Sequence, residues 1–376
     1  MTPSVHDAWW RLTTSPPRSL PDRLAVSVLH TAAGLYTAAA AARNAAYDCG
    51  WSRQIRLPRP VISVGNLSVG GTGKTPCVEW LVERLIATGR RPAVLSRGYG
   101  GRHADPYILQ AQTARLLSDD RSIASNRELA DEPQLLARHL ANVSVVVGRR
   151  REQSGAAAIA RLGADVLVLD DGFQYRRLAR DCDIVLLSGR MPLSGWPLLP
   201  AGPMREPLAS LRRAHVIIVT KADQSRDAVP ALLERMRIIN RAAVLATAAH
   251  EPAGVEDAAG GAAVAPKRVE GARVALVSSI GDPDGFEQTV RALGAESVGH
   301  QRYPDHHRYT GADWRDTMSW AGRLGAQALV TTEKDLIRLR PLVASASLPV
   351  WVARIRLRML TGQEAIDARL DTLLAR

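Results

Sequence analysis

The sequence predicts an α/β protein that has a P-loop domain with a doubly wound, mostly parallel sheet, a second and smaller α/β domain, and an N-terminal membrane-associated helix. Three observations predict it. Short apolar runs alternate with helical patterns from Val61 onward, a glycine-rich loop follows the first run, and an uncharged stretch precedes them. We place the boundaries at 1–52 for the N-terminal segment, 53–235 for the P-loop core and 236–376 for the smaller domain.

The strands of the larger domain are predicted from runs that are almost entirely Val, Ile and Leu, without polar alternation. Strands buried on both faces of a parallel sheet have this composition. Helical patterns between the runs predict crossovers and a ligand site at the carboxyl ends of the strands. The runs lie at 61–64, 93–96, 143–147, 166–169, 184–187 and 216–220, and the helices at 75–88, 132–140 and 152–162.

The smaller domain is predicted from a second set of such units. After Asp223 the pattern loosens, and an Ala- and Gly-rich tract at 253–265 indicates a surface loop. Apolar runs at 274–278 and 328–332 then predict strands. Helical patterns at 284–293 and 363–374 complete the predicted domain.

Charge and cysteine content narrow the class of protein. The 376 residues carry 49 Lys and Arg against 37 Asp and Glu, a formal net charge of +12. Such a balance favours anionic partners: nucleic acid, an anionic membrane face or a phosphorylated substrate. Three cysteines without metal-ligand spacing favour a reducing cytosolic compartment over a disulfide framework.

The N-terminal segment has the features of an interfacial helix. Leu24 to Ala42 has no formally charged residue, is rich in Ala, and is flanked by arginines and by Trp9, Trp10 and Trp51. We expect a helix lying in or against a membrane surface, because Ala-rich helices insert weakly. The alternative is an ordinary amphipathic helix packed on the protein.

A phosphate-binding loop follows the first predicted strand. Glycines and polar residues lead directly into a helical pattern, an arrangement in which backbone N–H groups and a helix N-terminus bind oxyanions. Lys74 would contact the β- and γ-phosphates and the Thr75 hydroxyl would hold Mg²⁺. The strict G-x-x-x-x-G-K-[ST] pattern misses by one residue, because Ser68 stands in the first glycine position. The loop residues are Gly70, Gly71, Thr72 and Gly73.

Two carboxylates end the strand predicted at 166–169. Asp170 and Asp171 have the form of a Walker B segment, and one of them would hold Mg²⁺ or a water bound to it. The alternative for a single Asp after a strand is a turn residue.

Arginines follow two further strands and are expected on the same edge of the sheet. Arg97 lies within a glycine-rich segment that continues to Gly101, and Arg149, Arg150 and Arg151 follow Gly148. Arginine binds phosphate through a bidentate fork, so these residues suit an anionic ligand. A plain glycine-rich loop and a solvated charge cluster are the alternatives.

Asp131 and the pair His306–His307 are candidates for acid–base chemistry. Asp131 opens a helix, where spacing favours a helix cap over a general base. His306 and His307 follow Asp305 in a predicted loop of the smaller domain, and no third ligand supports a metal site there. One histidine could instead assist a base from the other domain.

In their order along the chain, these motifs resemble the lipid A 4′-kinase (tetraacyldisaccharide 4′-kinase) family. The resemblance spans about 62–335, and its set of motifs is far more specific than any one of them. The motifs are GNLSVGGTGKTP at 65–76, SRGYG at 96–100, DEP at 131–133, VGRRR at 147–151, DDGFQ at 170–174, LPAGPMREP at 199–207, VTKAD at 219–223, SIGDP at 279–283, YPDHH at 303–307 and TTEKD at 331–335.

The resemblance implies transfer of the ATP γ-phosphate to the 4′-hydroxyl of an acylated glucosamine disaccharide 1-phosphate, giving the lipid A precursor lipid IVA. ATP and Mg²⁺ are the implied cofactors, and the cytoplasmic face of the inner membrane is the implied location. No nucleic-acid partner and no obligate protein partner are expected.

The resemblance also implies roles for single residues. Asp131 matches the base for the sugar hydroxyl, which reverses the preference for a cap, and His306 matches its partner from the smaller domain. One position departs from the family, because Tyr175 stands where the family usually has His. Further active-site positions are matched by Asp170, Asp171, Gln174, Arg151, Arg205 and Glu206, and Glu206 is a third candidate metal ligand.

Two other classes compete with a kinase. Thr220, Lys221 and Asp223 resemble a guanine-reading motif, which would fit a P-loop GTPase of regulatory or metal-delivery type. The chain lacks the His- or Cys-rich tract expected of metal delivery. A nucleic-acid-dependent ATPase would fit the charge, but the basic residues are not interleaved with stacking aromatics.

Overall fold

The computed structural model describes residues 9, 12–13, 19–99, 106–110, 113–116, 129–140, 142–192 and 196–375. The predicted features at Trp10, Gly100 and Gly101 lie outside these residues. The chain forms two compact units. The larger unit contains Asp7–Ala249 and Leu357–Arg376, and the smaller unit contains His250–Arg356.

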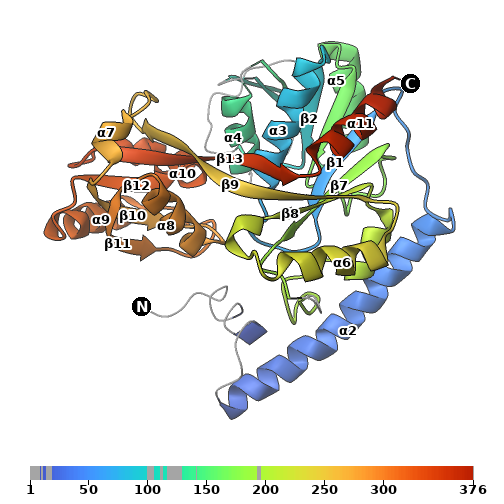
Figure 1. The fold of residues 1–376 in the computed structure, drawn as a ribbon, viewed down its shortest axis with the longest axis horizontal. Helices are drawn as coiled ribbons and strands as arrows, with labels where there is room; N and C mark the ends of the chain where they lie inside the picture. Colours follow the sequence, from blue (N-terminus) through green and yellow to red (C-terminus); the bar gives the residue numbers. More distant parts are fainter. Residues whose placement is uncertain are drawn as a thin grey trace. The chain divides into compact units, whose positions relative to one another are not determined.

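A mostly parallel sheet forms the larger unit, as the apolar runs predict (Figure 1). Its strand order is β9-β8-β7-β1-β6-β2-β5-β3-β4, and β3 pairs antiparallel with both β4 and β5. The strands are β1 Val61–Asn66, β2 Pro92–Ser96, β3 Tyr107–Gln110, β4 Thr113–Leu116, β5 Val145–Val147, β6 Val166–Asp170, β7 Cys182–Ser188, β8 Val216–Thr220 and β9 Val244–Asp257.

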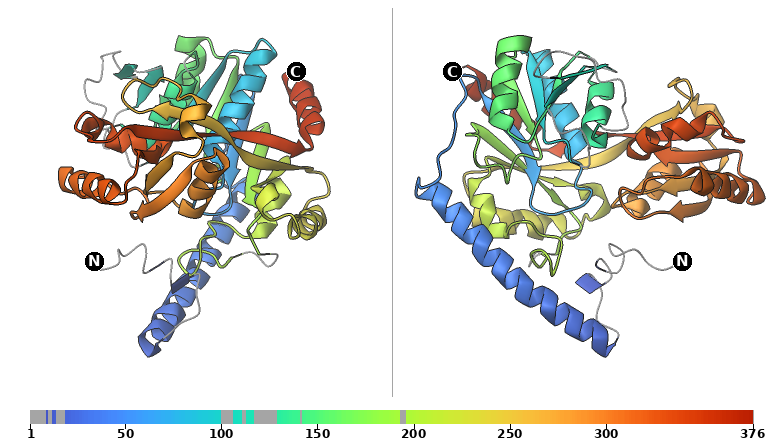
Figure 2. Two further views of the ribbon diagram at one scale, coloured as in Figure 1. Left: turned by 60° about the vertical axis from the view of Figure 1, so that its left-hand side comes forward. Right: turned by 180° about the vertical axis from the view of Figure 1, so that it is seen from behind.

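Helices cover both faces of this sheet (Figure 2). Ile62 and Val64 pack with α3 and α4 on one face, whereas the alternate residue Val61 packs with α5 on the other. Both faces are apolar because both are covered, which explains the absence of polar alternation. The helices are α2 Leu20–Asp48, α3 Lys74–Ala87, α4 Asp131–His139, α5 Arg151–Leu162, η2 Leu208–Arg213, η3 Ala222–Gln224, α6 Val229–Ile239 and α11 Gln363–Leu374.

The strand order of the larger unit locates its ligand edge. β1 lies between β6 and β7, so that the chain leaves β1 toward β2 on one side and later crosses to β7 on the other. At such a switch point the loops after neighbouring strands diverge and leave a crevice at the carboxyl ends. The phosphate loop follows β1, and Asp170 ends β6 opposite Val64. The fold therefore brings these two motifs together.

The smaller unit has its own parallel strands and two apolar cores. Its strand order is β11-β10-β12-β13-β9, and the long strands β9 and β13 contribute residues to both units. The elements are α7 Pro266–Val269, β10 Arg273–Ser278, α8 Pro283–Ala292, β11 Glu296–Arg302, α9 Gly311–Arg323, β12 Ala328–Thr332, α10 Glu333–Val343 and β13 Val350–Thr361.

Two sequence-based assignments differ from the structure in this region. The tract at 253–265 was expected to be a loop, but β9 continues through Asp257 because its backbone pairs with a neighbouring strand despite small side chains. Helix α11 was grouped with the smaller domain, but its Ile366 and Leu370 are buried in the core of the larger unit. Sequence order alone does not reveal that the chain returns.

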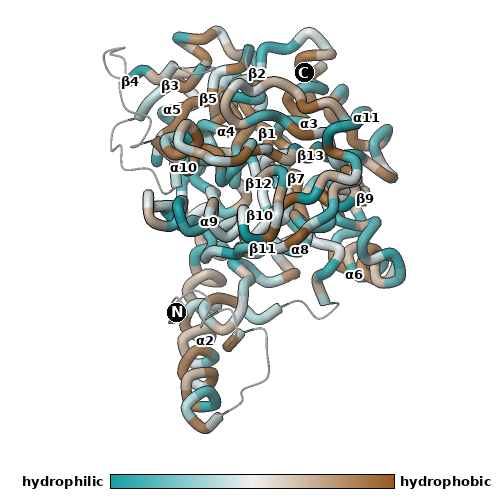
Figure 3. Tube along the Cα trace, turned by 90° about the vertical axis from the view of Figure 1, so that its left-hand side faces the viewer, coloured by the Kyte–Doolittle hydropathy of each residue, from teal (hydrophilic) through white to brown (hydrophobic). Residues whose placement is uncertain are grey.

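Helix α2 is long and almost entirely exposed, with Ala33 its one buried residue among those described. By length and composition it is apolar enough to cross a membrane. Figure 3 shows the hydrophobic residues distributed along it. Leu20, Leu24, Val28 and Leu35 are each more than 60% exposed. At 3.6 residues per turn these four fall within about 80° of one another and form a continuous apolar stripe.

Candidate active site

The phosphate loop has the backbone that its glycines allow. Gly70 and Gly73 have φ angles of 105° and 84°, in the left-handed region that favours glycine. Gly73 is the N-cap of α3, so that Lys74 and Thr75 are the first two residues of the helix. The free N–H groups of this first turn are the donors expected of an anion site.

Residues at the ends of β1 and β8 hold the loop in place. The Asn66 amide donates to Thr72 Oγ1 at 2.7 Å. The Thr220 hydroxyl donates to the Thr72 carbonyl at 2.9 Å, and Lys221 Nζ donates to the Gly71 carbonyl at 2.9 Å. Sequence reasoning placed Thr220 and Lys221 in a nucleotide-base motif and missed this role. The signal was available, because β8 ends at the same edge of the sheet as β1.

Asp171 is the charge-paired member of the aspartate pair. Arg205 Nη1 lies 2.7 Å from Asp171 Oδ2, and Lys74 Nζ lies 3.7 Å from its Oδ1. Burial alone would raise the pKa of Asp171, but Lys74 and Arg205 outweigh it and hold that pKa below its ordinary value. The Asp171 backbone has a φ of 50°, so its side chain leaves the strand in a direction that regular β geometry would not give.

Asp170 has the opposite electrostatic balance. It is buried, and the Ser96 hydroxyl donates to its Oδ2 at 3.2 Å. Burial raises the pKa of Asp170 to about 7, with the carboxylates of Glu132 and Asp171 adding to the effect. A buried carboxylate whose charge is poorly compensated is the kind of group that a cation would stabilise.

Arg151 is the buried member of the three consecutive arginines. Its Nη2 donates to the Asp170 carbonyl at 3.2 Å, and its guanidinium lies 4.8 Å from the centre of the Tyr175 ring. Burial lowers the pKa of Arg151 from its ordinary value. Arg149 and Arg150 are exposed. The cluster therefore divides into one buried arginine that contacts the aspartate pair and two exposed ones.

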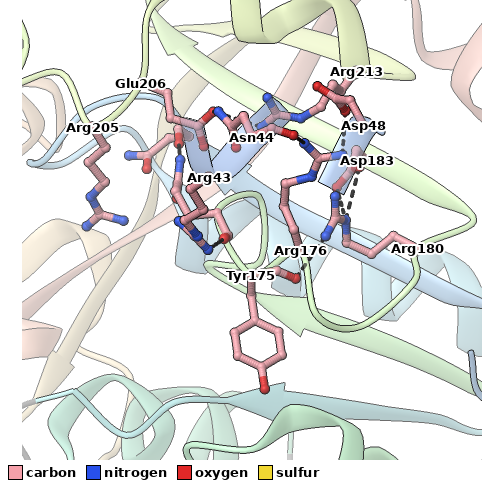
Figure 4. Close-up of polar contacts among 12 residues, drawn as sticks. Arg43, Asn44, Asp48, Tyr175, Arg176, Arg180, Asp183, Arg205, Glu206 and Arg213 are labelled. Carbon is pink, nitrogen blue, oxygen red and sulfur yellow. Dashed lines mark hydrogen bonds and ion pairs between the residues drawn. The ribbon is translucent and has the colours of Figure 1, made fainter. Parts of the chain in front are cut away.

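Tyr175, where the family usually has His, secures the start of α5. Its hydroxyl donates to Glu152 Oε2 at 2.5 Å and accepts from the Arg151 N–H at 3.3 Å. Burial, followed by the Glu152 carboxylate, raises the pKa of Tyr175 to about 12. In Figure 4 its ring points away from the other labelled residues. Tyr175 thus contacts Arg151 in two ways, through its ring and through its hydroxyl.

Arg205 and Glu206 are joined to helix α2 (Figure 4). The Tyr36 hydroxyl donates to the Arg205 carbonyl at 2.9 Å, and the Asn44 amide donates to Glu206 Oε2 at 3.0 Å. Arg213 Nη2 also donates to Glu206 Oε2, at 2.9 Å. Glu206 is thereby held in a buried ion pair between α2 and η2.

Gln174 and Arg176 make further links to α2, and Figure 4 labels Arg176 together with its partner Asp48. Arg43 Nη2 donates to the Gln174 carbonyl at 2.5 Å, while the Gln174 amide donates to the Asn66 carbonyl at 2.9 Å. The buried Arg176 donates to Asp48 Oδ1 at 2.7 Å. The last turns of α2 are therefore attached to the segment that follows the aspartate pair.

The residues at the phosphate loop fit Mg²⁺ bound together with a nucleotide. Mg²⁺ uses one or two carboxylates and completes its shell with water and phosphate oxygens. Asp170 supplies a buried carboxylate and Thr75 a hydroxyl on the first turn of α3. Among the described residues no group of three His, Cys, Asp or Glu side chains forms a metal cluster.

Asp131 is not a helix cap. The N-cap of α4 is Ala130, without a side-chain hydrogen bond, and Asp131 is the first helical residue. Its neighbour Glu132 acts electrostatically on Asp170, so the start of α4 lies near the aspartate pair. Arg97, after β2, is exposed. Both positions are compatible with contact to a bound ligand, and their roles stay predictions.

The two candidate histidines, His306 and His307, have different environments. The His307 ring stacks on Tyr303 with 4.6 Å between centroids, and its Nε2 lies 3.2 Å from Asp313 Oδ2. His306 is half exposed, with a φ of 62°. Its Nδ1 lies 2.9 Å from Arg338 Nη2. His307 is a packing residue, whereas His306 is presented to solvent.

Comparison with known proteins gives a consistent result. A family model described as tetraacyldisaccharide-1-P 4′-kinase (LpxK) matches residues 25–375. The chain is 40% identical over 373 residues to a tetraacyldisaccharide 4′-kinase of Anaeromyxobacter sp. (strain Fw109-5), a match that covers 99% of this chain and 97% of the relative. It is 42% identical over 325 residues to one of Syntrophus aciditrophicus (strain SB), covering 84% and 85%.

A solved structure supports the fold. A crystal structure of LpxK from Aquifex aeolicus in complex with ATP superposes with a TM-score of 0.72 at 29% sequence identity. The match covers 93% of this chain and 99% of that chain. The alternative of a regulatory or metal-delivery GTPase is not favoured by these relatives.

Proposed function

This chain belongs to the tetraacyldisaccharide-1-P 4′-kinase family, and from this premise we propose that it transfers the γ-phosphate of ATP to the 4′-hydroxyl of a tetraacylated glucosamine disaccharide 1-phosphate. The observation that carries the proposal is the phosphate loop after β1 with Asp170 beside it at the end of β6. The rest of the ligand edge supplies cations and a carboxylate.

The donor phosphates are bound by backbone and side-chain donors of the loop. The N–H groups from Gly70 to Gly73 and the amine of Lys74 stabilise the negative charge that spreads over the transferring group. Thr75 and Asp170 would hold Mg²⁺, which supplies further neutralisation of the β- and γ-phosphates. Arg205, which pairs with Asp171, would add a further positive charge.

The acceptor hydroxyl needs a base and correct alignment. Asp131, on the first turn of α4, would take the proton of the 4′-hydroxyl, and His306 would act as the partner of that base, as the family resemblance implies. The hydroxyl oxygen forms the new bond to the γ-phosphorus as the bond to the β-phosphate oxygen breaks, and ADP leaves. Positioning supplies much of the rate in such a reaction.

Product mass tests this function directly. The purified protein is incubated with ATP, Mg²⁺ and a tetraacylated disaccharide 1-phosphate, and we expect a product heavier by one phosphate. Asp131→Ala and His306→Ala should each reduce turnover by about 10²-fold or more while ATP still binds. An unchanged lipid in the presence of the wild-type protein would refute the activity, and two fully active variants would refute the base and its partner.

We further propose that α2 attaches the protein to the cytoplasmic face of the inner membrane. The apolar stripe from Leu20 to Leu35 covers one side of the helix. The residues that bind the larger unit, Tyr36 and Asn44, lie on the opposite side by the same helical count. This division suits a helix with one side in lipid and the other on the protein, close to an amphiphilic substrate.

Serine substitutions in the stripe test the attachment. The variant Leu24→Ser, Val28→Ser, Leu35→Ser should lose sedimentation with anionic vesicles while its phosphorylation of a detergent-dispersed substrate persists. Its matched control carries serines at the exposed Ala39, Ala41 and Ala45, which remove far less apolar surface. Equal vesicle binding by both variants would place the attachment elsewhere.

A further inference from the structure

A buried carboxylate organises the part of the smaller unit that carries His306. Asp335 lies on the first turn of α10 and has no exposed surface. It accepts hydrogen bonds from the Ser279 hydroxyl, from the Ser279 N–H at 3.0 Å, from Thr332 Oγ1 at 2.8 Å and from Tyr309 at 3.2 Å. Four donors on one buried carboxylate make a rigid centre. The motifs at 279–283 and 331–335 therefore meet at Asp335. Neither motif contributes to the phosphate-loop site described above.

Arg338 connects this centre to His306. One turn along α10 from Asp335, its Nη1 donates to Ser279 Oγ at 2.9 Å and lies 3.6 Å from Asp335 Oδ1. The other arm of the guanidinium, Nη2, lies 2.9 Å from His306 Nδ1. The His306 N–H donates to the Ser279 carbonyl at 3.2 Å. Ser279 therefore holds the backbone of His306 directly and its ring through Arg338.

The chemistry of this contact determines where the imidazole proton lies. A guanidinium has only donors, so His306 Nδ1 must be the acceptor and carry no hydrogen. The ring is therefore neutral, with its proton on Nε2. The nearest acidic group recorded for Nε2 is Asp305, whose Oδ1 at 3.9 Å is beyond hydrogen-bond reach. The Nε2–H is left available on a half-exposed ring.

We propose that Arg338 is a positioning residue for catalysis: held by Asp335 and Ser279, it fixes His306 as the neutral Nε2–H tautomer and aims that N–H outward as a donor. This deepens the proposed function and rests on it, since a donor of this kind is what the carboxylate of Asp131 would need from a partner. The backbone of His306 is constrained as well, because its positive φ is unfavourable for a residue with a side chain and must be held by the surrounding contacts.

Nitrogen NMR of the full chain labelled with ¹⁵N-histidine tests the tautomer. For His306, assigned by the signal lost in His306→Gln, we expect Nδ1 at the position of an unprotonated ring nitrogen and Nε2 at that of a protonated one. Arg338→Met should mix the two tautomers and average both signals, whereas Arg340→Ala, an exposed arginine of the same helix, should change neither. A protonated Nδ1 in the wild type, or signals unchanged by Arg338→Met, would overturn the proposal.

Kinetics separate positioning from folding. Arg338→Met should lower kcat by about 10- to 100-fold with an unchanged KM for ATP, because the donor site lies in the other unit. Arg338→Lys keeps a positive charge beside Asp335 but has no planar fork to reach both Ser279 and His306. It should show the same NMR change and a comparable loss of kcat. Arg340→Ala should retain wild-type kcat.

The outcomes distinguish the two proposals. A fully active His306→Ala would refute the role of His306 in the proposed function, while the nitrogen signals would still decide whether Arg338 fixes its tautomer. An inactive His306→Ala beside a fully active Arg338→Met would refute the positioning role alone. A loss of activity in Arg338→Met together with a raised KM for ATP would indicate that the substitution disrupts the whole protein, and it would also refute the positioning role.

Discussion

An arginine holds a side chain of the candidate site in each of the two units, but the two contacts differ. In the larger unit Arg205 pairs with a carboxylate, Asp171, and in the smaller unit Arg338 pairs with a neutral ring nitrogen of His306. Both partners have a positive φ, and among the described non-glycine residues they share this only with Lys221. The contact of Arg205 neutralises the charge of Asp171, whereas the contact of Arg338 determines which ring nitrogen of His306 carries the proton.

This difference fits the two halves of a phosphoryl transfer. Phosphates bring several negative charges, so their site must present cations while keeping its own carboxylates ionised. A sugar hydroxyl carries no charge, so its site depends on orientation. It needs a base at the correct position and a histidine in the tautomer that can donate to that base. Charge-conserving variants should therefore be tolerated in the larger unit and not in the smaller one.

The largest effect is expected from removing cations at the phosphate loop. Lys74→Ala should lower kcat by about 10³-fold and weaken ATP binding, because both the phosphates and Asp171 lose a positive charge. Arg205→Ala should show a smaller loss, and Arg205→Lys should restore most of it. Arg237→Ala, in an exposed pair with Glu234, is the control for steady-state kinetics. If Arg205→Lys is as inactive as Arg205→Ala, the geometry of the arginine and not its charge matters in the larger unit, as we propose for the smaller one.

The aspartate pair gives stability changes of opposite sign. The folded protein binds the Asp170 proton more tightly than the unfolded chain, so this group's contribution to stability falls as pH rises from about 4 to about 7. Asp170→Asn should therefore raise Tm at pH 8 by roughly 4 °C, and much less at pH 4.5, while lowering kcat by about 10²-fold. Melting is measured without nucleotide or divalent cation.

Asp171 is the matched comparison. Its pKa is lowered in the folded state, so it adds stability above its unfolded pKa that is lost as pH falls. Asp171→Asn should accordingly lower Tm at pH 8. Shifts of the same sign in both variants would contradict the assignment of one paired and one uncompensated carboxylate.

A moderate effect is expected at Tyr175. Tyr175→Phe keeps the ring under Arg151 but loses the hydroxyl that bonds the Glu152 carboxylate and the Arg151 N–H at the start of α5, and kcat should fall by about 5-fold. Tyr175→Leu removes the ring as well and should be several times worse. Equal activity of all three proteins would show that Arg151 needs no support from this side.

The smallest effect on turnover is expected at His307. Because its ring packs on Tyr303 and meets Asp313, His307→Gln should lower Tm by about 2 °C while kcat changes by less than about 3-fold. The neighbouring His306→Gln should do the reverse, with little change in Tm and a large loss of kcat. A large kcat loss in His307→Gln would move the chemistry from one histidine to the other.

The sequence predicted well what is local or periodic. β8 and β12 have the expected bounds, and α3 differs from its predicted range by one residue at each end, because unbroken apolar runs and glycine punctuation are local signals. The long strands β9 and β13 were not recognised, since their partly polar sequences depend on pairing partners far along the chain. The cap reading of Asp131 was wrong by one position, which lies within the usual uncertainty of helix ends.

At the site, the sequence identified the motifs but not their connections. Lys74, Asp170 and Asp171 were recognisable because each follows a strand at the ligand edge. The link from Asp335 through Ser279 and Arg338 to His306 joins two loops and the first turns of α10, and no spacing in the chain predicts it. The attachment of α2 through Asn44 to Glu206 was hidden for the same reason.

The path of the chain through β9 and β13 has a consequence for biosynthesis. The smaller unit is inserted between Ala249 and Leu357, and α11, which follows it, supplies Ile366 and Leu370 to the core of the larger unit and pairs its Asp367 with Arg84 of α3. On a ribosome the larger unit would emerge first and yet wait, with part of its apolar surface uncovered, until the whole insertion has been translated. The interval between these two events is when this protein would most need a chaperone.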